Sequence, residues 1–224
     1  MGVGLFERRT LNREKSPPTE AMLNGTQFEH LVNSVLDGET LDEDHKWYKG
    51  VMGVARYVRG SQQQVTLFRE IEVDGQPYLM HGVLDYLRAG VIYDCKFTKN
   101  YHLNKYLTTS QTPIYMYLVP EARRFEYVIS DGTYVYKEKY PRDIVQPIEP
   151  IIRQFANCCK LHGLWDTLAE KWSVEKYDRL ELQERRKRGQ RLSRRKAPLC
   201  DNRGRGGRQQ VERSSDDCHY RPSE

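Results

Sequence analysis

Apolar positions recur with the three- to four-residue period of an amphipathic helix in two early segments. The first runs from about Thr26 to a stop at Gly38, and the second covers residues 47–58. Later segments predict a helix near residues 110–118 and a long closing helix over residues 144–172. The chain is therefore expected to begin and end its folded part with helices.

Between these helices the pattern changes to short runs of β-branched and aromatic residues, which are typical of strands. Asp74-Gly75 and Ala89-Gly90 favour tight hairpin turns, and Asp131-Gly132 is expected to join the last two strands. The predicted strands cover residues 65–73, 78–87, 91–97, 125–129 and 133–140. This order of elements predicts an α/β (α+β) fold with a mixed sheet flanked by helices.

The composition is too polar for a membrane protein. Of the 224 residues, 38% are hydrophobic and 30% are charged. No run approaches the roughly 18 apolar residues of a spanning helix, and the charged N-terminus has no signal-peptide core. The five cysteines are scattered, so we expect reduced thiols, a cytoplasmic location and no membrane partner.

The charge is unevenly distributed along the chain. From Glu181 to the C-terminus there are 13 Lys/Arg against 7 Asp/Glu, whereas the other 180 residues hold 23 basic and 24 acidic groups. We expect a loose arm over residues 1–22, one domain over residues 23–175, and a basic, largely disordered tail over residues 176–224. The Arg/Gly run of the tail is typical of a solvated segment, and a nucleic-acid clamp is the alternative.

The third predicted strand contains Asp94-Cys95-Lys96, which interrupts an apolar run with two charges. Strand side chains alternate, so Asp94 and Lys96 are expected on one face. If Ala89-Gly90 is a two-residue turn, counting back places Asp85 opposite Asp94, where two like charges destabilise the sheet. Such a pair of carboxylates would suit Mg²⁺ or Mn²⁺, with Lys96 as a neighbouring charge. The alternative is a solvated acidic face that Lys96 neutralises.

Gln111 and Tyr115 share one face of the next predicted helix, because they are four residues apart. The succession Gly82-x-x-Asp85, Asp94-x-Lys96 and Gln111-x-x-x-Tyr115 resembles the PD-(D/E)XK nuclease superfamily. Within that superfamily it is most similar to the branch of RecB-type nuclease domains and phage exonucleases. The resemblance implies a restriction-endonuclease-like αβββαβ core.

The resemblance also implies a role for individual residues. Asp85 and Asp94 would bind the metal, together with the backbone carbonyl of Cys95, and Lys96 would be catalytic. Gln111 and Tyr115 would orient the DNA strand. Glu29, on the first helix, is a candidate additional ligand, although an exposed glutamate on an amphipathic helix needs no function.

We therefore expect an Mg²⁺- or Mn²⁺-dependent deoxyribonuclease, more typical of an exonuclease than of an endonuclease, in phage-like DNA processing or recombination. No cysteine precedes Cys95, so we expect no iron–sulfur cluster, and any helicase or recombination partner would be a separate chain. A nuclease-fold module that binds nucleic acid or protein without cleavage is the alternative. A chance match on a structural domain is the third interpretation.

Overall fold

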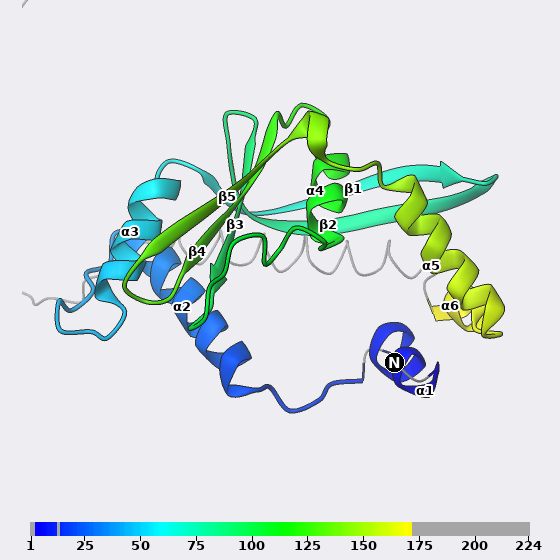
Figure 1. Cartoon of the computed structure of the whole chain (residues 1–224), viewed down its shortest axis with the longest axis horizontal. Coiled ribbons are helices and arrows are strands. Elements are labelled where there is room, and N and C mark those ends of the chain that lie inside the picture. Colours follow the sequence, from blue (N-terminus) through cyan, green and yellow to red (C-terminus); the bar gives the residue numbers. More distant parts are fainter. Residues whose placement is uncertain (1–2, 13, 172–224) are drawn as a thin grey trace, which may run out of the picture. The chain divides into compact units, whose positions relative to one another are not determined.

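The computed structural model describes residues 3–12 and 14–171, and its centre is a five-stranded sheet (Figure 1). The strands are β1 Gln62–Val73, β2 Gln76–Arg88, β3 Val91–Phe97, β4 Arg124–Ser130 and β5 Val135–Pro141. They lie in the order β1-β2-β3-β4-β5; β3 and β4 run parallel, and the other neighbours are antiparallel. This is the mixed sheet that the sequence predicts. The predicted basic tail, residues 176–224, lies outside the described residues.

Two tight turns join the first three strands, at the positions that the sequence predicts. Asp74 and Gly75 connect β1 to β2, and Ala89 and Gly90 connect β2 to β3. All four residues have positive φ, between 48° and 76°, as a type I′ turn requires. The connection between β4 and β5 is longer and comprises residues 131–134.

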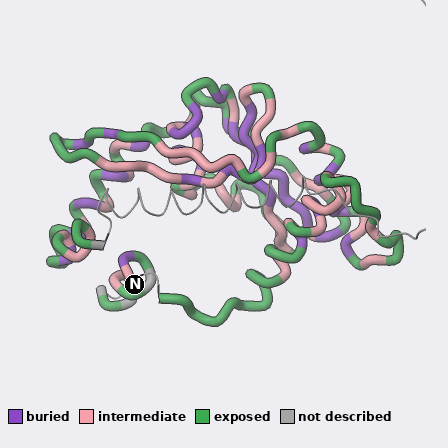
Figure 2. The backbone as a smooth tube through the Cα atoms, turned by 180° about the vertical axis from the view of Figure 1, so that it is seen from behind, coloured by how far each residue is buried: buried purple, intermediate pink, exposed green. Residues whose placement is uncertain are grey.

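Helices cover both faces of the sheet. Helices α2 (Glu20–Leu36) and α3 (Tyr48–Val58) pack on one face, where they share an apolar cluster with β2, β3 and β4. Helix α4 (Gln111–Leu118) packs on the opposite face and is part of the crossover between the parallel strands. Figure 2 shows that the buried residues gather where the strands meet these helices.

Most residues of strand β3 are buried, because it has a helix layer on each side. Val91 and Cys95 belong to the cluster under α2 and α3, whereas Ile92 belongs to the cluster under α4. Asp94 shares the α4 face with Ile92, because side chains alternate along a strand. A charged residue therefore stands in an apolar row at the centre of the sheet.

Part of the predicted N-terminal arm is helical. Helix α2 begins at Glu20 instead of Thr26, because the side chain of Thr19 accepts a hydrogen bond from the backbone N–H of Met22 at 3.3 Å. Its first turns are exposed and lack the apolar period that marks the rest. Upstream, α1 (Val3–Phe6) and one stretch of π-helix, η1 (Glu7–Leu11), end with Leu11 buried.

The predicted long closing helix is wrong. The structure has a short 3₁₀ turn η2 (Arg142–Ile144), then α5 (Glu149–Leu161) and α6 (Trp165–Lys171). Pro150 occupies the first turn of α5, where its missing N–H is tolerated, and Gly163 has a φ of 65°, which ends the helix. With these breaks, no helix within residues 3–12 and 14–171 is long and apolar enough to cross a bilayer.

The close contact between α3 and the β4–β5 connection generates a stability prediction. A Cβ atom on Gly50 would lie 2.7 Å from the carbonyl carbon of Gly132 and would also meet Ser130. Gly50→Ala should therefore lower the free energy of unfolding by about 1–3 kcal/mol, measured by urea denaturation.

The matched control is Gly25→Ala in α2, where a Cβ atom would meet nothing within 4 Å. This change should raise stability by up to about 1 kcal/mol, because alanine has the better helix propensity. Equal effects of the two substitutions would show that the close contact at Gly50 is not a packing constraint.

Candidate functional site

Asp94 is the most buried charged group at the candidate site, with 1% of its side chain exposed. Its Oδ1 accepts a hydrogen bond from Nε2 of Gln111 at 2.5 Å, and its Oδ2 lies 2.5 Å from Nζ of Lys96. Lys96 is 29% exposed. The structure thus brings the predicted Asp94, Lys96 and Gln111 into direct contact.

Asp85 joins this group from β2 by a different route from the one that the register predicts. The pairing of β2 with β3 runs from Arg88 to Tyr86 and stops there. Beyond that point Oδ2 of Asp85 accepts a hydrogen bond from the backbone N–H of Cys95 at 2.8 Å. The carboxylate of Asp85 therefore takes the place of a ladder partner, and Asp85 does not form the expected cross-strand pair with Asp94.

A local irregularity in β1 and β2 accounts for this arrangement. The pairing of the two strands skips Gln64 and Asp85, and Gln64 has a φ of 51°. On either side of the break, Leu84 packs in the cluster under α4 and Tyr86 in the cluster under α2 and α3. Left-handed backbone at a non-glycine residue outside a turn costs about 1–3 kcal/mol, and such residues cluster at active sites and ligand clamps.

Gln64 is a residue of the candidate site that sequence reasoning missed, and it connects Glu29 to it. Nε2 of Gln64 donates a hydrogen bond to Oε1 of Glu29 at 3.0 Å. Glu29 repels both Asp85 and Asp94 electrostatically. Among the described residues, however, no three Asp, Glu, His or Cys side chains are grouped as one metal site. Glu29 therefore borders the carboxylate pair without completing a three-ligand cluster.

The electrostatics of the site follow from burial. Burial, together with repulsion from Asp94 and Glu29, raises the pKa of Asp85 to about 8. Burial also raises the pKa of Asp94, although Lys96 and Gln111 oppose the shift. For Lys96 burial favours the neutral amine, but attraction to Asp94 and Asp85 outweighs it and raises the pKa. Lys96 is therefore cationic at neutral pH.

The helix that carries Gln111 is fixed to β2 by Tyr115. The hydroxyl of Tyr115 donates a hydrogen bond to the carbonyl oxygen of Val83 at 2.8 Å. A Cβ atom on Gly82 would lie 2.9 Å from the Tyr115 ring and 2.7 Å from Leu118. Glycine at position 82 thus permits the close approach of α4 to β2. Gln111 and Tyr115 both bond to the sheet, as their four-residue spacing allows.

Tyr127 is a second neighbour that sequence reasoning missed. It pairs with Asp94 across the parallel strands, and its ring centre lies 5.9 Å from Nζ of Lys96. Its hydroxyl lies 2.6 Å from Oγ1 of Thr109 and accepts a hydrogen bond from Thr112 at 3.2 Å. The parallel register depends on the crossover through α4, so this contact cannot be predicted from the local sequence pattern.

The donor set fits a divalent cation. The half-buried Asp85 and the buried Asp94 lie on adjacent strands; burial raises the pKa of both, and repulsion from Asp94 adds to the shift of Asp85. Carboxylate and backbone carbonyl oxygens are the hard ligands that Mg²⁺ and Mn²⁺ prefer. The backbone carbonyl of Cys95, between the two charged residues of β3, is the third oxygen donor that the resemblance implies.

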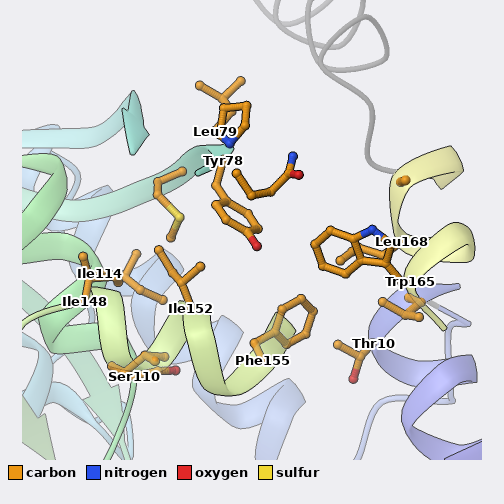
Figure 3. A pocket seen from close by; sticks show the side chains of 16 residues that line it. Thr10, Tyr78, Leu79, Ser110, Ile114, Ile148, Ile152, Phe155, Trp165 and Leu168 are labelled. Atoms are coloured by element: carbon orange, nitrogen blue, oxygen red, sulfur yellow. The ribbon is translucent and has the colours of Figure 1, made fainter. Parts of the chain in front are cut away.

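A cavity lies apart from the residues of the candidate site (Figure 3). It has a volume of about 490 Å³ and an apolar lining that includes Tyr78, Ile152, Phe155 and Trp165. None of the charged residues of the candidate site lines it. Ser110, which lines the cavity, directly precedes Gln111 in the chain.

Comparisons with known proteins assign this chain to no family. No family model matches the chain, and no curated protein matches it. A solved structure titled "Crystal structure of SSO0001" is similar over 70% of this chain and 69% of that chain, with 19% sequence identity and a TM-score of 0.45. A similarity at this level does not identify a shared function.

The raised pKa of Asp85 predicts how stability depends on pH without metal. Between the ordinary value of 3.8 and about 8, the folded protein retains a proton that the unfolded chain has lost. Stability should therefore fall as the pH rises through this range, by up to about 1.4 kcal/mol per pH unit.

Asp85→Asn should remove this part of the pH dependence, measured as unfolding free energy in EDTA at pH 5 and pH 8. Asp74→Asn is the matched control, because the exposed Asp74 is paired with Arg153 and its pKa is lowered. If the wild type and Asp85→Asn lose the same stability from pH 5 to pH 8, the carboxyl of Asp85 has an ordinary pKa.

Proposed function

We propose that this chain is a metal-dependent DNA nuclease of the PD-(D/E)XK superfamily, similar to the RecB-type and phage exonuclease branch. The observation that carries the proposal is the meeting of Asp85, Asp94, Lys96 and Gln111 at one buried point of the sheet. These residues come from β2, β3 and α4, in the order of the sequence motif. A chance match of short motifs would have no reason to join Lys96 and Gln111 to Asp94 and to bring Asp85 to the backbone of Cys95, the next residue.

The carboxylates of Asp85 and Asp94 and the carbonyl oxygen of Cys95 would hold the cation. A bound Mg²⁺ or Mn²⁺ ion supplies a Lewis acid that polarises phosphate oxygens and activates water. Burial supports this assignment, because without a metal Asp85 keeps its proton at neutral pH, and a divalent cation would allow both carboxylates to be charged. Lys96 supplies only one positive charge for two acids.

Lys96 would act on the phosphate itself. Its ammonium group is partly exposed and remains charged at neutral pH, since its pKa is raised. Its ion pair with Asp94 holds the charge at a fixed position. A preorganised cation at this position stabilises the negative charge that develops on the phosphate oxygens during hydrolysis.

Gln111 and Tyr115 would hold the two carboxylates of the site in position. Gln111 holds Oδ1 of Asp94, and Tyr115 holds the strand that carries Asp85. In this proposal they orient the carboxylates as well as the DNA strand. Loss of either side chain would therefore weaken the binding of the cation.

The first test of the function is cleavage of DNA by Lys96→Ala. The protein is incubated with linear and covalently closed DNA in Mg²⁺ or Mn²⁺, and the products are sized. The wild type should degrade linear DNA preferentially, as an exonuclease does. Lys96→Ala should retain less than about a tenth of the activity, a loss of at least about 1.4 kcal/mol of transition-state stabilisation.

Lys99→Ala is the matched control, because Lys99 is 68% exposed and pairs with Glu20 away from the carboxylates. It should cleave at a rate close to that of the wild type. A wild-type protein that binds DNA and metal but cuts neither substrate would instead be a binding module on this fold. Equal activity of Lys96→Ala and the wild type would remove Lys96 from the mechanism.

The second test measures metal binding through stability. A cation that binds only the folded state adds about 2.7 kcal/mol at a hundredfold excess over its Kd. Mn²⁺ should therefore raise the melting temperature of the wild type at pH 7.5. Asp94→Asn should lose most of this shift, whereas the control Asp74→Asn should keep it. No shift in the wild type at millimolar Mn²⁺ would contradict the metal site and the proposed nuclease with it.

A further inference from the structure

The connection between β3 and α4 is long and has an unusual composition. Residues 98–110 contain turns and bends but no helix or strand. The segment holds two lysines, one histidine and no acidic residue. Leu103 and Leu107 are 72% and 56% exposed. Connections of this length within a domain are uncommon unless they bind something.

Two tyrosines of this connection, Tyr101 and Tyr106, pack against the apolar cluster on the α4 face of the sheet. The ring of Tyr106 is 4.8 Å from that of Tyr127, whose centre is 5.9 Å from Nζ of Lys96. Tyr106 is half-buried and therefore reaches from the candidate site to the surface. Tyr127 and Tyr106 thus form a row of aromatic rings that leads from Lys96, the catalytic lysine of the proposed mechanism, toward the surface.

A second aromatic pair, Tyr101 and Tyr136, continues this row of rings across the sheet. Lys96 pairs with Ile129 on β4, and Ile129 pairs with Tyr136 on β5. Two strand spacings, about 10 Å, therefore separate the backbones of Lys96 and Tyr136. Tyr101 stacks on Tyr136 with ring centres 4.4 Å apart and an interplanar angle of 22°.

The position of this pair is fixed by polar contacts. The hydroxyl of Tyr136 donates a hydrogen bond to Asp131 at 3.0 Å. Nζ of Lys105 donates hydrogen bonds to Oγ1 of Thr98 at 2.6 Å and to the carbonyl oxygen of Asn100 at 3.1 Å, beside Tyr101. Because the connection is held in this way, its aromatic rings are preorganised.

We propose that Tyr101, Tyr106 and Tyr136, with Lys105, whose Nζ lies 5.9 Å from the ring centre of Tyr106, form a surface that binds the unpaired nucleotides of the DNA strand next to Lys96. We name these four residues the tyrosine surface. The inference rests on the proposed nuclease function and adds the substrate class, which is single-stranded DNA or a duplex with a single-stranded end. Aromatic rings stack on any base, and lysines contact the phosphates, so such a surface is tolerant of sequence.

The geometry favours unpaired over paired DNA. The rings of Tyr101 and Tyr136 stack face to face, and a base can extend such a stack only when its own face is uncovered. The bases of a duplex are already stacked on their neighbours. Residues 98–110 add no acidic residue to this surface, and the neighbouring carboxylate of Asp131 already accepts hydrogen bonds from Tyr136 and from two backbone N–H groups.

The test is a binding titration in EDTA, in which no cleavage occurs. The probes are a fluorescein-labelled oligonucleotide of about twelve thymidines and a blunt duplex of the same length. The wild type should bind the single strand more tightly. Tyr101→Ala should weaken single-strand binding by about fivefold to a hundredfold, the effect of one lost stacking contact, and leave duplex binding unchanged.

Tyr101→Phe is the matched variant, since it keeps the ring and removes only the hydroxyl; it should bind like the wild type. Replacement of one thymidine by 2-aminopurine gives a second readout, because stacking on a tyrosine quenches its fluorescence. The quenching should be present with Tyr101→Phe and absent with Tyr101→Ala at saturating protein. Melting temperatures of both variants establish that they are folded.

The outcomes separate this inference from the proposed function. Equal single-strand binding by Tyr101→Ala and the wild type, with no quenching in either, would overturn the tyrosine surface even if the protein cleaves DNA. Loss of single-strand binding in Tyr101→Ala would support the tyrosine surface even if no cleavage is found, and the nuclease proposal would fail by itself. A wild type that prefers the duplex would also overturn it.

Discussion

The buried carboxylate of Asp94 is the constraint on which the arrangement of the other elements depends. A charge in the middle of an apolar sheet is unfavourable unless every polar atom around it has a partner. Lys96 provides the countercharge from the same strand, and Gln111 provides an amide from α4. Helix α4 must therefore lie close to the sheet at this point, and Gly82 gives it the space to do so.

The same constraint relates the hairpin to the site. Asp85 satisfies the N–H of Cys95 with its side chain, so the regular ladder between β2 and β3 stops where the carboxylates begin. Stability of the sheet and chemistry at its centre compete for the same backbone groups. The structure resolves this competition with one side-chain hydrogen bond and one left-handed residue, Gln64.

The sequence carries most of the information for the local part of this arrangement. Turn dipeptides and strand alternation place Asp94 and Lys96 together, because both depend on neighbouring residues only. The contacts of Tyr127 and Gln64 could not be predicted in this way. Tyr127 depends on the register of a parallel pair set through α4, and Gln64 depends on a backbone conformation that glutamine seldom adopts. The closing helix failed because Gly163 and Pro150 outweigh the apolar period around them.

The left-handed backbone at Gln64 also bears on which sequences can replace this one. The residue is exposed, and its side chain could be exchanged for many polar ones without loss of packing. A β-branched residue such as valine or isoleucine, otherwise favoured in strands, would be strained at a φ of 51°. Among sequences that keep this fold, position 64 should thus accept polar side chains that can still donate to Glu29, but exclude the side chains that strands usually select.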